Sequence, residues 1–451
     1  LDNCYSFKNF TARGYICKTN TVSNTAFRGF GGPQGMLAIE NILERVSRFL
    51  GIDLDALRHE NYYSLKNGIK TPYGQIVKNI KIEKIIDEME NFAGLAKRKL
   101  QVEKFNKSQI NENKPYRKGI AFMPAKFGIS FNKVSLNQAG ALVHVYTDGS
   151  VRLNHGGTEM GQGLFTKVAQ VVSECFNIPI DYVHISGTNT DEVPNTSATA
   201  ASSGSDINGM AAWKAASVIK KRMLKQASKV FQKSPSSIEF RNGLILSGNK
   251  SMTFKELAFS CWENRVSLSS TGFYKTPKIS WDQEKFKGSP YFYFTWGAAV
   301  SEAIIDIDTG ESRILRADII QDCGSSLNPL IDKGQIEGGF VQGIGWLTCE
   351  ELYFNPEGKL LTLGPSTYKI PGSRDVPPEF NIKLLENAPN EEKTIFRSKA
   401  VGEPPLLLAI SHFMALKNAV SMASETSNAD LLNAPATPSK ILAAVYNDHS
   451  M

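Results

Sequence analysis

Hydrophobic and polar positions along the chain repeat with two spacings, one typical of helices and one typical of strands. Apolar side chains three and four positions apart predict amphipathic helices at residues 36–50, from about 82, and at 164–176, 210–224 and 406–422. Alternating or short apolar runs predict strands at residues 119–124, 140–146, 151–154, 183–186, 298–305 and 312–319. Turned strands interleaved with long helices favour an α+β fold.

One long stretch fits neither spacing. Residues 101–118 are charged, rich in asparagine and poor in apolar side chains. Because this composition is typical of loops, we predict that the stretch connects an α-rich N-terminal region to a mixed region after it.

Glycine-rich or serine-rich loops precede several of the predicted helices. They lie at residues 23–35, 156–163, 196–205, 337–345 and 401–405. Free backbone N–H groups at a helix start favour an anion, and Arg28 in the first loop adds a fixed positive charge. The recurrence predicts that these loops converge on one large, polar, anionic ligand. No GxxxxGK[ST] phosphate loop occurs, and a strand–GxGxxG–helix unit is not convincingly present.

The bulk composition narrows the class of protein. The 451 residues, 21% of them charged and 41% apolar, are typical of a soluble globular chain of two or three domains. The net charge of +7 is spread over short basic runs on helical patterns, so we expect no nucleic-acid partner. No apolar run is long enough for a membrane span, and the first twenty residues are unlike a signal peptide. We therefore expect a cytoplasmic location.

The metal-binding residue types are scattered. The six cysteines (4, 17, 175, 261, 323 and 349) form no CxxC pair, and the six histidines form no HExxH motif. This argues against a disulfide scaffold and against zinc or iron–sulfur ligation within the chain. If a metal acts here, its main ligands are expected to come from outside the protein. The first residues, without a methionine, suggest the continuation of a longer polypeptide.

Seven motifs, in this order, are similar to the xanthine and aldehyde oxidase family, in the C-terminal part of its molybdopterin-binding subunit. They lie at residues 19–34, 126–131, 136–141, 155–163, 194–203, 322–329 and 399–405. The resemblance covers essentially the whole chain. It implies a multi-lobed α+β fold whose Gly-rich loops surround the cofactor. It also implies two domains: residues 1–115 as the C-terminal part of a first molybdopterin-binding domain, and residues 116–451 as a second.

The resemblance assigns a cofactor site to loop residues. Arg28 and Ala201 are expected near the molybdenum, Ala201 through its backbone N–H and neither as a side-chain ligand. The amides of Gln162 and Gln342 are expected to hydrogen-bond the pterin. The remaining cofactor-binding positions are small residues that let the cofactor approach, namely Gly161, Ala200 and Ser202.

The resemblance also implies the chemistry. Glu403 is expected to be the general base in the hydroxylation of a heterocyclic carbon with oxygen from water. On residue pattern alone, a glutamate in the first turn of a helix is better explained by the helix dipole, and it is the resemblance that favours the general base. Phe30 and Phe131 match the purine-oxidising branch, where two rings bracket a flat heterocycle. Asn132 stands where the family commonly has threonine, at a substrate-contacting position.

The resemblance implies partners as well. Electrons are expected to pass to two [2Fe–2S] clusters and FAD on other domains or subunits, and then to NAD. The chain is thus expected in a hetero-oligomer, a dimer of assemblies that includes the upstream half of the molybdenum subunit. The expected reaction is hypoxanthine to xanthine to urate. The alternatives are a hydroxylase of aldehydes or other N-heterocycles, and a non-catalytic half of the cofactor cage. A nucleotide-binding module is disfavoured because the phosphate loops are missing.

Overall fold

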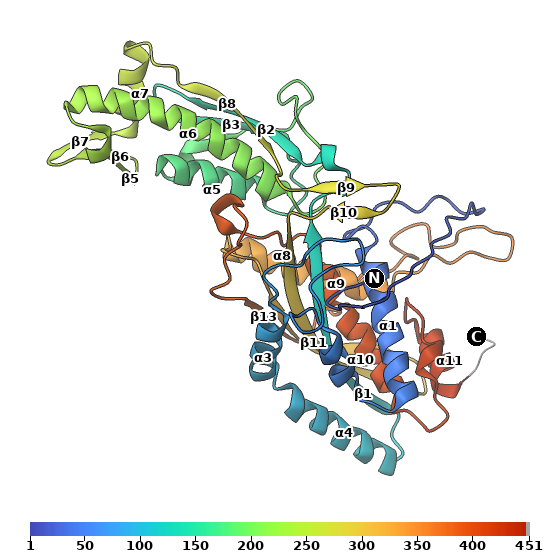
Figure 1. The fold of residues 1–451 in the computed structure, drawn as a ribbon. Coiled ribbons are helices and arrows are strands. Elements are labelled where there is room, and N and C mark those ends of the chain that lie inside the picture. The colour runs from blue at the N-terminus through green and yellow to red at the C-terminus, as the bar shows by residue number, and fades with distance from the viewer. Residues whose placement is uncertain (448–451) are drawn as a thin grey trace.

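The computed structural model describes residues 1–447 and contains two lobes (Figure 1). The inner lobe is formed by residues 1–129 and 293–447. The outer lobe is formed by residues 138–275, which are inserted between two long strands of the inner lobe. Its buried core lies entirely within residues 139–274, so it packs as a unit of its own. This mixture of helices and sheets confirms the predicted multi-lobed α+β fold.

A four-stranded sheet runs through the inner lobe in the order β1-β11-β12-β13. The strands are β1 (Tyr116–Ile129), β11 (Tyr293–Asp306), β12 (Ser312–Gln321) and β13 (Glu379–Leu384). β1, β11 and β12 are antiparallel neighbours, and β13 is parallel to β12. Side chains alternate between the two faces of a strand. Accordingly, Ala298 and Val300 belong to one buried cluster and Ala299 and Ala303 to another.

Helices cover both faces of this sheet. The helices of the inner lobe are α1 (Gly32–Leu50), α2 (Leu54–Asn61), α3 (Ile82–Ala93), α4 (Leu95–Asn111), α8 (Pro329–Thr348), α9 (Pro404–Leu408), α10 (Ile410–Ser421) and α11 (Pro438–Tyr446). α8, α9 and α10 pack on one face, and α3 packs on the other. Among the helices of residues 1–447, none has the length and apolar character needed to cross a lipid bilayer.

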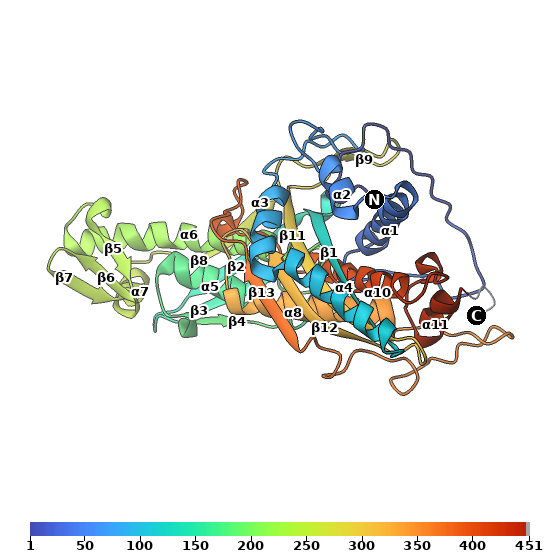
Figure 2. The same cartoon turned by 90° about the horizontal axis from the view of Figure 1, so that it is seen from below.

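The outer lobe has a second four-stranded sheet, in the order β4-β3-β2-β8. Its strands are β2 (Gln138–Val145), β3 (Val151–His155), β4 (Val183–Ile185) and β8 (Ser269–Lys275), covered by α5 (Leu164–Phe176) and α6 (Gly204–Phe231). A small sheet of β5 (Glu239–Arg241), β6 (Leu244–Ser247) and β7 (Lys250–Thr253) lies with α7 (Phe254–Glu263) at the far end (Figure 2). The hairpin of β9 (Ser280–Asp282) and β10 (Lys287–Ser289) follows the lobe in sequence.

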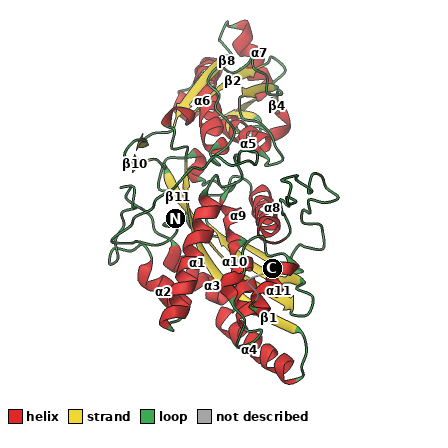
Figure 3. Cartoon of the chain, turned by 90° about the vertical axis from the view of Figure 1, so that its right-hand side faces the viewer, coloured by secondary structure: helices red, strands yellow, loops and turns green. Residues whose placement is uncertain are grey.

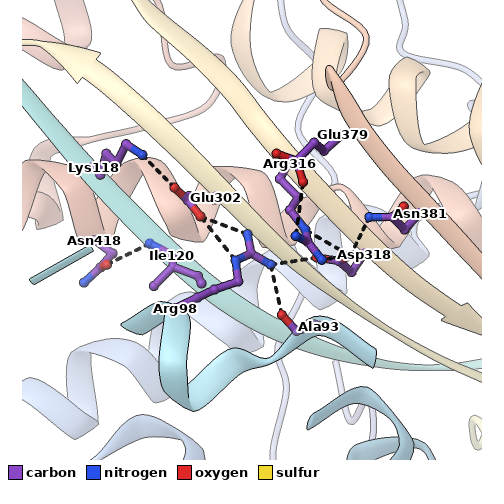
Figure 4. Close-up of polar contacts among 10 residues, drawn as sticks. All are labelled: Ala93, Arg98, Lys118, Ile120, Glu302, Arg316, Asp318, Glu379, Asn381 and Asn418. Atoms are coloured by element: carbon purple, nitrogen blue, oxygen red, sulfur yellow. Dashed lines mark hydrogen bonds and ion pairs between the residues drawn. The ribbon is translucent and has the colours of Figure 1, made fainter. Parts of the chain in front are cut away.

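The predicted connection at residues 101–118 is wrong. α4 continues to Asn111, and β1 begins at Tyr116. α4 is attached to the sheet partly by charge: Arg98 lies 3.0 Å from Glu302 of β11 and 2.7 Å from Asp318 of β12 (Figure 4). A count of apolar residues cannot detect a helix that is held by a partly buried ionic network.

The loop predicted at residues 337–345 is also wrong, because these residues lie inside α8. The helix begins earlier, where the Asn328 side chain accepts a hydrogen bond from the Ile331 N–H at 3.1 Å and Pro329 fills the first position. Its glycines serve close packing instead: a Cβ on Gly343 would lie 2.5 Å from the Leu406 carbonyl oxygen. The helix predicted at residues 406–422 is split into α9 and α10.

Candidate functional site

Three segments far apart in the sequence meet around one carboxylate, that of Glu403. The Gly29 N–H donates to Glu403 Oε1 at 3.2 Å, and the Ser202 hydroxyl donates to Oε2 at 2.8 Å. The Ser202 oxygen in turn accepts the Glu403 N–H at 2.8 Å. The loop before α1, the loop before α6 and the start of α9 are therefore fixed to one another. α8 and α9 lie in the part of the inner lobe that faces the outer lobe (Figure 3).

The start of α9 explains why this carboxylate is available. Glu403 is the residue before the helix, and Pro404 and Pro405 fill its first two positions. Prolines are well accommodated there because those N–H groups have no partner within the helix. The Glu403 side chain makes no capping hydrogen bond to its own helix. The carboxylate therefore faces other segments instead of capping its own helix.

The surroundings of Glu403 change its acidity. Burial raises the pKa of the carboxyl above its ordinary value of 4.5. The hydrogen bonds from Ser202 and Gly29, and the positive charge of Arg28, act in the opposite direction without cancelling the effect. A carboxylate with a raised pKa accepts a proton more readily at neutral pH, as a general base must.

Arg28 joins this group to α8. Its Nε donates to the Gly402 carbonyl at 2.6 Å, one residue before Glu403. Its Nη2 donates to the carbonyl and side-chain oxygens of Gln335 at 3.2 and 3.3 Å, and its Nη1 donates to Gln342 Oε1 at 3.4 Å. Burial lowers the pKa of Arg28, while the Glu403 charge raises it. The structure thus brings together Arg28, Ser202, Gln342 and Glu403.

Two neighbouring glycines of α8 provide a test of this packing. A Cβ on Gly339 would lie 2.9 Å from both Arg28 Nη2 and Pro405 Cβ, whereas a Cβ on Gly338 would meet no atom within 4 Å. We expect Gly339→Ala to cost about 1–3 kcal/mol by overpacking and to displace the Arg28 guanidinium. Gly338→Ala should be neutral or slightly stabilising in the helix. Thermal denaturation checks both variants, and equal stability would contradict the packing described here.

The loop before α6 has an unusual backbone. Ala201 and Ser202 have φ angles of +55° and +54°, a left-handed conformation that is rare for residues with side chains. Within residues 1–447, neither backbone N–H donates a hydrogen bond. Ala200 precedes them and is exposed. Strain of this kind persists where the surrounding structure holds it, and here the Ser202 hydroxyl is held by Glu403.

The loop with Gly161 and Gln162 lies apart from the hydrogen-bonded group around Glu403. Gly161 has a φ angle of +92° and open space where a Cβ would be. Gln162 is engaged within its own loop: its Oε1 accepts the Met160 N–H at 2.5 Å, and its Nε2 donates to the Thr158 carbonyl at 2.7 Å. No hydrogen bond among the described residues joins Gln162 to Arg28 or Glu403, so its cofactor-binding role stays a prediction.

The residues expected to bind substrate lie at two loops. Phe30 is 73% exposed and has a φ angle of +42°. Phe131 is half-buried after the end of β1, and its backbone N–H and carbonyl are both bonded to the Asn137 amide at 2.8 Å. Asn132 is exposed. The rings of Phe30 and Phe131 are not stacked on each other among the described residues. Their role in binding a substrate stays a prediction.

Sequence reasoning missed several residues behind this site. Gln335 holds Arg28 and carried no signal in the sequence. Lys399 and Asp322 form a buried ion pair at 2.6 Å that supports the segment before Glu403, and both lie within the quoted motifs. The buried pair of Tyr293 and Asp206, joined at 2.7 Å, lies outside every motif and carried no sequence signal at all.

The donors left free at the site fit an organic cofactor with polar edges. Gln342 Nε2 and the Ala201 N–H make no hydrogen bond within the part of the chain that the structure describes. Among the same residues 1–447, no group of three or more His, Cys, Asp or Glu could hold a metal ion. The site therefore offers amide and guanidinium donors beside one carboxylate, which suits a ligand that brings its own metal donors.

Comparison with protein families gives two matches. A family model described as the molybdopterin cofactor-binding domain matches residues 88–377. A second model with the same description matches residues 1–62.

Known proteins resemble the chain over nearly all of its length. It is 47% identical over 448 residues to xanthine dehydrogenase/oxidase of Felis catus, covering 98% of this chain and 32% of that protein. It is 46% identical over 446 residues to xanthine dehydrogenase of Dictyostelium discoideum, covering 98% of this chain and 31% of that protein. The chain thus spans less than one third of the length of these relatives.

Solved structures share the fold. Reconstituted CO dehydrogenase from Oligotropha carboxidovorans superposes with a TM-score of 0.80 at 20% identity, covering 93% of this chain and 52% of that chain. Quinoline 2-oxidoreductase from Pseudomonas putida 86 gives a TM-score of 0.78 at 22% identity, covering 93% of this chain and 53% of that chain. At such low identity the likeness concerns the fold alone.

Proposed function

The chain belongs to the family of molybdopterin cofactor-binding domains, as its motifs predicted, and from this we propose that it carries the cofactor and the general base of a purine-oxidising molybdenum hydroxylase. The observation that carries the proposal is the Glu403 carboxylate. It has a raised pKa, does not cap its own helix, and is held by the two loops expected to border the cofactor. The identity to xanthine dehydrogenases over 98% of the chain supports a purine substrate.

In this proposal each residue has a distinct task. The bound cofactor supplies oxygen-transfer and two-electron chemistry. Glu403 accepts a proton at a carboxylate oxygen, and the Ser202 hydroxyl at Oε2 and the Gly29 N–H at Oε1 keep the carboxylate oriented. The cofactor is bound by Arg28, Gln342 and the Ala201 N–H. Gly161, Gln162 and Ala200 also contribute to its binding.

Substrate binding is assigned to aromatic residues. Phe30 and Phe131 bracket the flat heterocycle from its two sides, because aromatic rings bind such a system through stacked or edge contacts. Asn132 contributes an amide that both donates and accepts hydrogen bonds. The exposure of Phe30, at 73%, leaves its ring free to meet a ligand.

The wider assembly is part of the same proposal. Electrons leave through [2Fe–2S] clusters and FAD on other domains or subunits and reach NAD. The chain acts in the cytoplasm within a dimer of such assemblies, together with an upstream half of the molybdenum subunit. Within the chain, residues 1–115 complete a first cofactor-binding domain, and residues 116–451 form the second.

A substrate panel tests the proposed function. The native assembly that contains this chain should reduce NAD with hypoxanthine and with xanthine, forming urate, and should turn over simple aldehydes far more slowly. Bound molybdenum with turnover of aldehydes or another N-heterocycle, but not of purines, would move the assignment to those substrates. Turnover that persists when this chain lacks bound molybdenum would show it to be a non-catalytic half of the cofactor cage.

A further inference from the structure

The side chain of Tyr293 joins two segments of the site without belonging to either. Its hydroxyl oxygen accepts the Ala400 N–H at 2.8 Å, three residues before Glu403. The same hydroxyl donates to Asp206 Oδ2 at 2.7 Å, in the first turn of α6 and four residues after Ser202. Both Tyr293 and Asp206 are only 6% exposed. The Glu403 segment is thus tied to the start of α6 at two points, through Ser202 directly and through Tyr293.

The backbone of Tyr293 reaches a third segment. Tyr293 begins β11 and lies opposite Ile129, the last residue of β1, two residues before Phe131. Next to it, the Phe292 N–H donates to the Ile129 carbonyl at 3.0 Å. Ile129, Phe292, Tyr293 and Ala400 also form a small buried cluster of their own. Tyr293 therefore contacts three segments: the one before Glu403, the one after Ser202 and the one before Phe131.

The chemistry of Ala400, Tyr293 and Asp206 determines which group donates in each of these two hydrogen bonds. Burial, followed by the effect of Asp206, raises the pKa of Tyr293 well above its ordinary value, so the hydroxyl keeps its proton. Burial raises the pKa of Asp206 to about 7, although the Tyr293 hydrogen bond and the Lys167 charge lower it. With the Ala400 N–H donating to its oxygen, Tyr293 has one proton to give, and Asp206 receives it.

We propose that Tyr293 and Asp206 are positioning residues that fix residues 398–403, and with them the Glu403 carboxylate, relative to the cofactor loop and to Phe131. This rests on the proposed function, in which Glu403 is the general base. Without the hydroxyl, the Ala400 N–H and the Asp206 carboxyl have no partner at this point. Glu403 keeps its own contacts to Ser202 and Gly29. Its segment, however, loses the link through Tyr293 to the start of α6.

Tyr293→Phe in the native assembly tests this proposal. We expect kcat per bound molybdenum to fall by about ten- to a hundredfold, because a small misplacement of a catalytic group is costly. The KM for xanthine should change by less than about threefold, because substrate contacts remain. Tyr63→Phe is the matched control: Tyr63 is also buried and donates to an aspartate, Asp2, at 2.8 Å, but outside the site. It should leave kcat unchanged.

Two variants of Asp206 separate positioning from stability. Asp206→Asn keeps an oxygen that accepts the Tyr293 hydrogen bond and should retain the wild-type kcat. Asp206→Ala removes that oxygen, and its kcat should fall as in Tyr293→Phe. A wild-type kcat in Tyr293→Phe, or equal losses in both Asp206 variants, would overturn the proposal. Failure of Tyr293→Phe and Asp206→Ala to bind molybdenum would also overturn it, because the pair would then serve folding. If the Glu403→Gln variant turns over xanthine as fast as the wild type does, the proposed function fails instead.

Discussion

Replacing Glu403 with glutamine should abolish most of the hydroxylation activity while leaving the cofactor in place. Glutamine has almost the same shape, and its side-chain oxygen can still accept the hydrogen bond from Ser202 or from Gly29. It cannot accept a proton at neutral pH. General bases contribute roughly a hundred- to ten-thousandfold to rate, and we expect kcat per bound molybdenum to fall within that range. Steady-state turnover of xanthine, measured beside the molybdenum content, checks the prediction.

A second carboxylate provides the matched control for this substitution. Glu159 also accepts backbone hydrogen bonds at a helix start, from the N–H groups of Gly161, Gly163 and Phe165, but none from the Glu403 group. Glu159→Gln should alter the stability of that loop and the binding of cofactor rather than kcat per bound molybdenum. Unimpaired turnover in Glu403→Gln, at normal molybdenum content, would end the case for Glu403 as the base.

The raised pKa of Glu403 adds a dependence on pH. A general base works in its ionised form, so activity should fall as the pH drops through the pKa of Glu403, which lies above 4.5. The Ser202 hydrogen bond lowers that pKa. Ser202→Ala should therefore raise the pKa further and move the acid limb of kcat/KM to higher pH. Ser205→Ala, which changes no hydrogen bond to Glu403, should leave the limb in place. An unshifted limb in Ser202→Ala would contradict this account.

Local patterns in the sequence predicted several of the helices and strands that bury apolar side chains, but not α7 or α11. The periodicity from residue 164 to about 176 predicted the helix α5, and the apolar run at 312–319 lies within β12. Charge and glycine content led to wrong predictions at α4 and α8. α4 contacts the sheet through Arg98, and the glycines of α8 admit Arg28 and α9 at close range. Such roles depend on partners far away along the chain, more than 200 residues for the contacts of Arg28 and Arg98, and local patterns contain no information about them.

The roles of individual site residues were predictable only through motifs. Composition and spacing placed Arg28, Ser202 and Glu403 in three separate loops, and the recurrence of such loops predicted that they converge on one ligand. Which of their atoms meet is visible only in the structure. The resemblance assigned Ser202 to the cofactor, whereas the structure also shows it bonded to Glu403 at 2.8 Å. Tyr293 and Asp206 have no distinguishing neighbours in the sequence. Their pairing arises because the first residue of β11 and the first turn of α6 are brought together by the fold.

The helix that follows the Arg28 loop depends on a buried ion pair. Glu40 of α1 is completely buried, and its only cationic partner among the described residues is Arg58 of α2, at 2.6 Å. Asn3 and the Tyr5 hydroxyl complete its hydrogen bonds at 2.8 and 2.7 Å. A carboxylate in this environment is stable only with its charge balanced. This pair therefore fixes α1, and with it the loop that carries Arg28 and Gly29.

Replacing Arg58 with methionine should cost about 3–5 kcal/mol, because it leaves Glu40 buried without a counter-charge. Hydrogen exchange of the α1 and α2 amides in the native assembly should then accelerate by more than about a hundredfold. Lys107→Met is the matched control, since Lys107 and Glu103 form an exposed pair on α4, and such pairs contribute at most about 1 kcal/mol.

The double variant Arg58→Met with Glu40→Gln decides whether charge is the cause. If the cost arises from the unpaired carboxylate, neutralising Glu40 restores part of the stability, and the double variant exchanges more slowly than Arg58→Met alone. If the two losses simply add, Arg58 acts through packing of its side chain and its hydrogen bonds to the Phe122 carbonyl and to Asp55. In the first case, loss of Arg58 also weakens cofactor retention, because the start of α1 no longer holds Gly29 against Glu403.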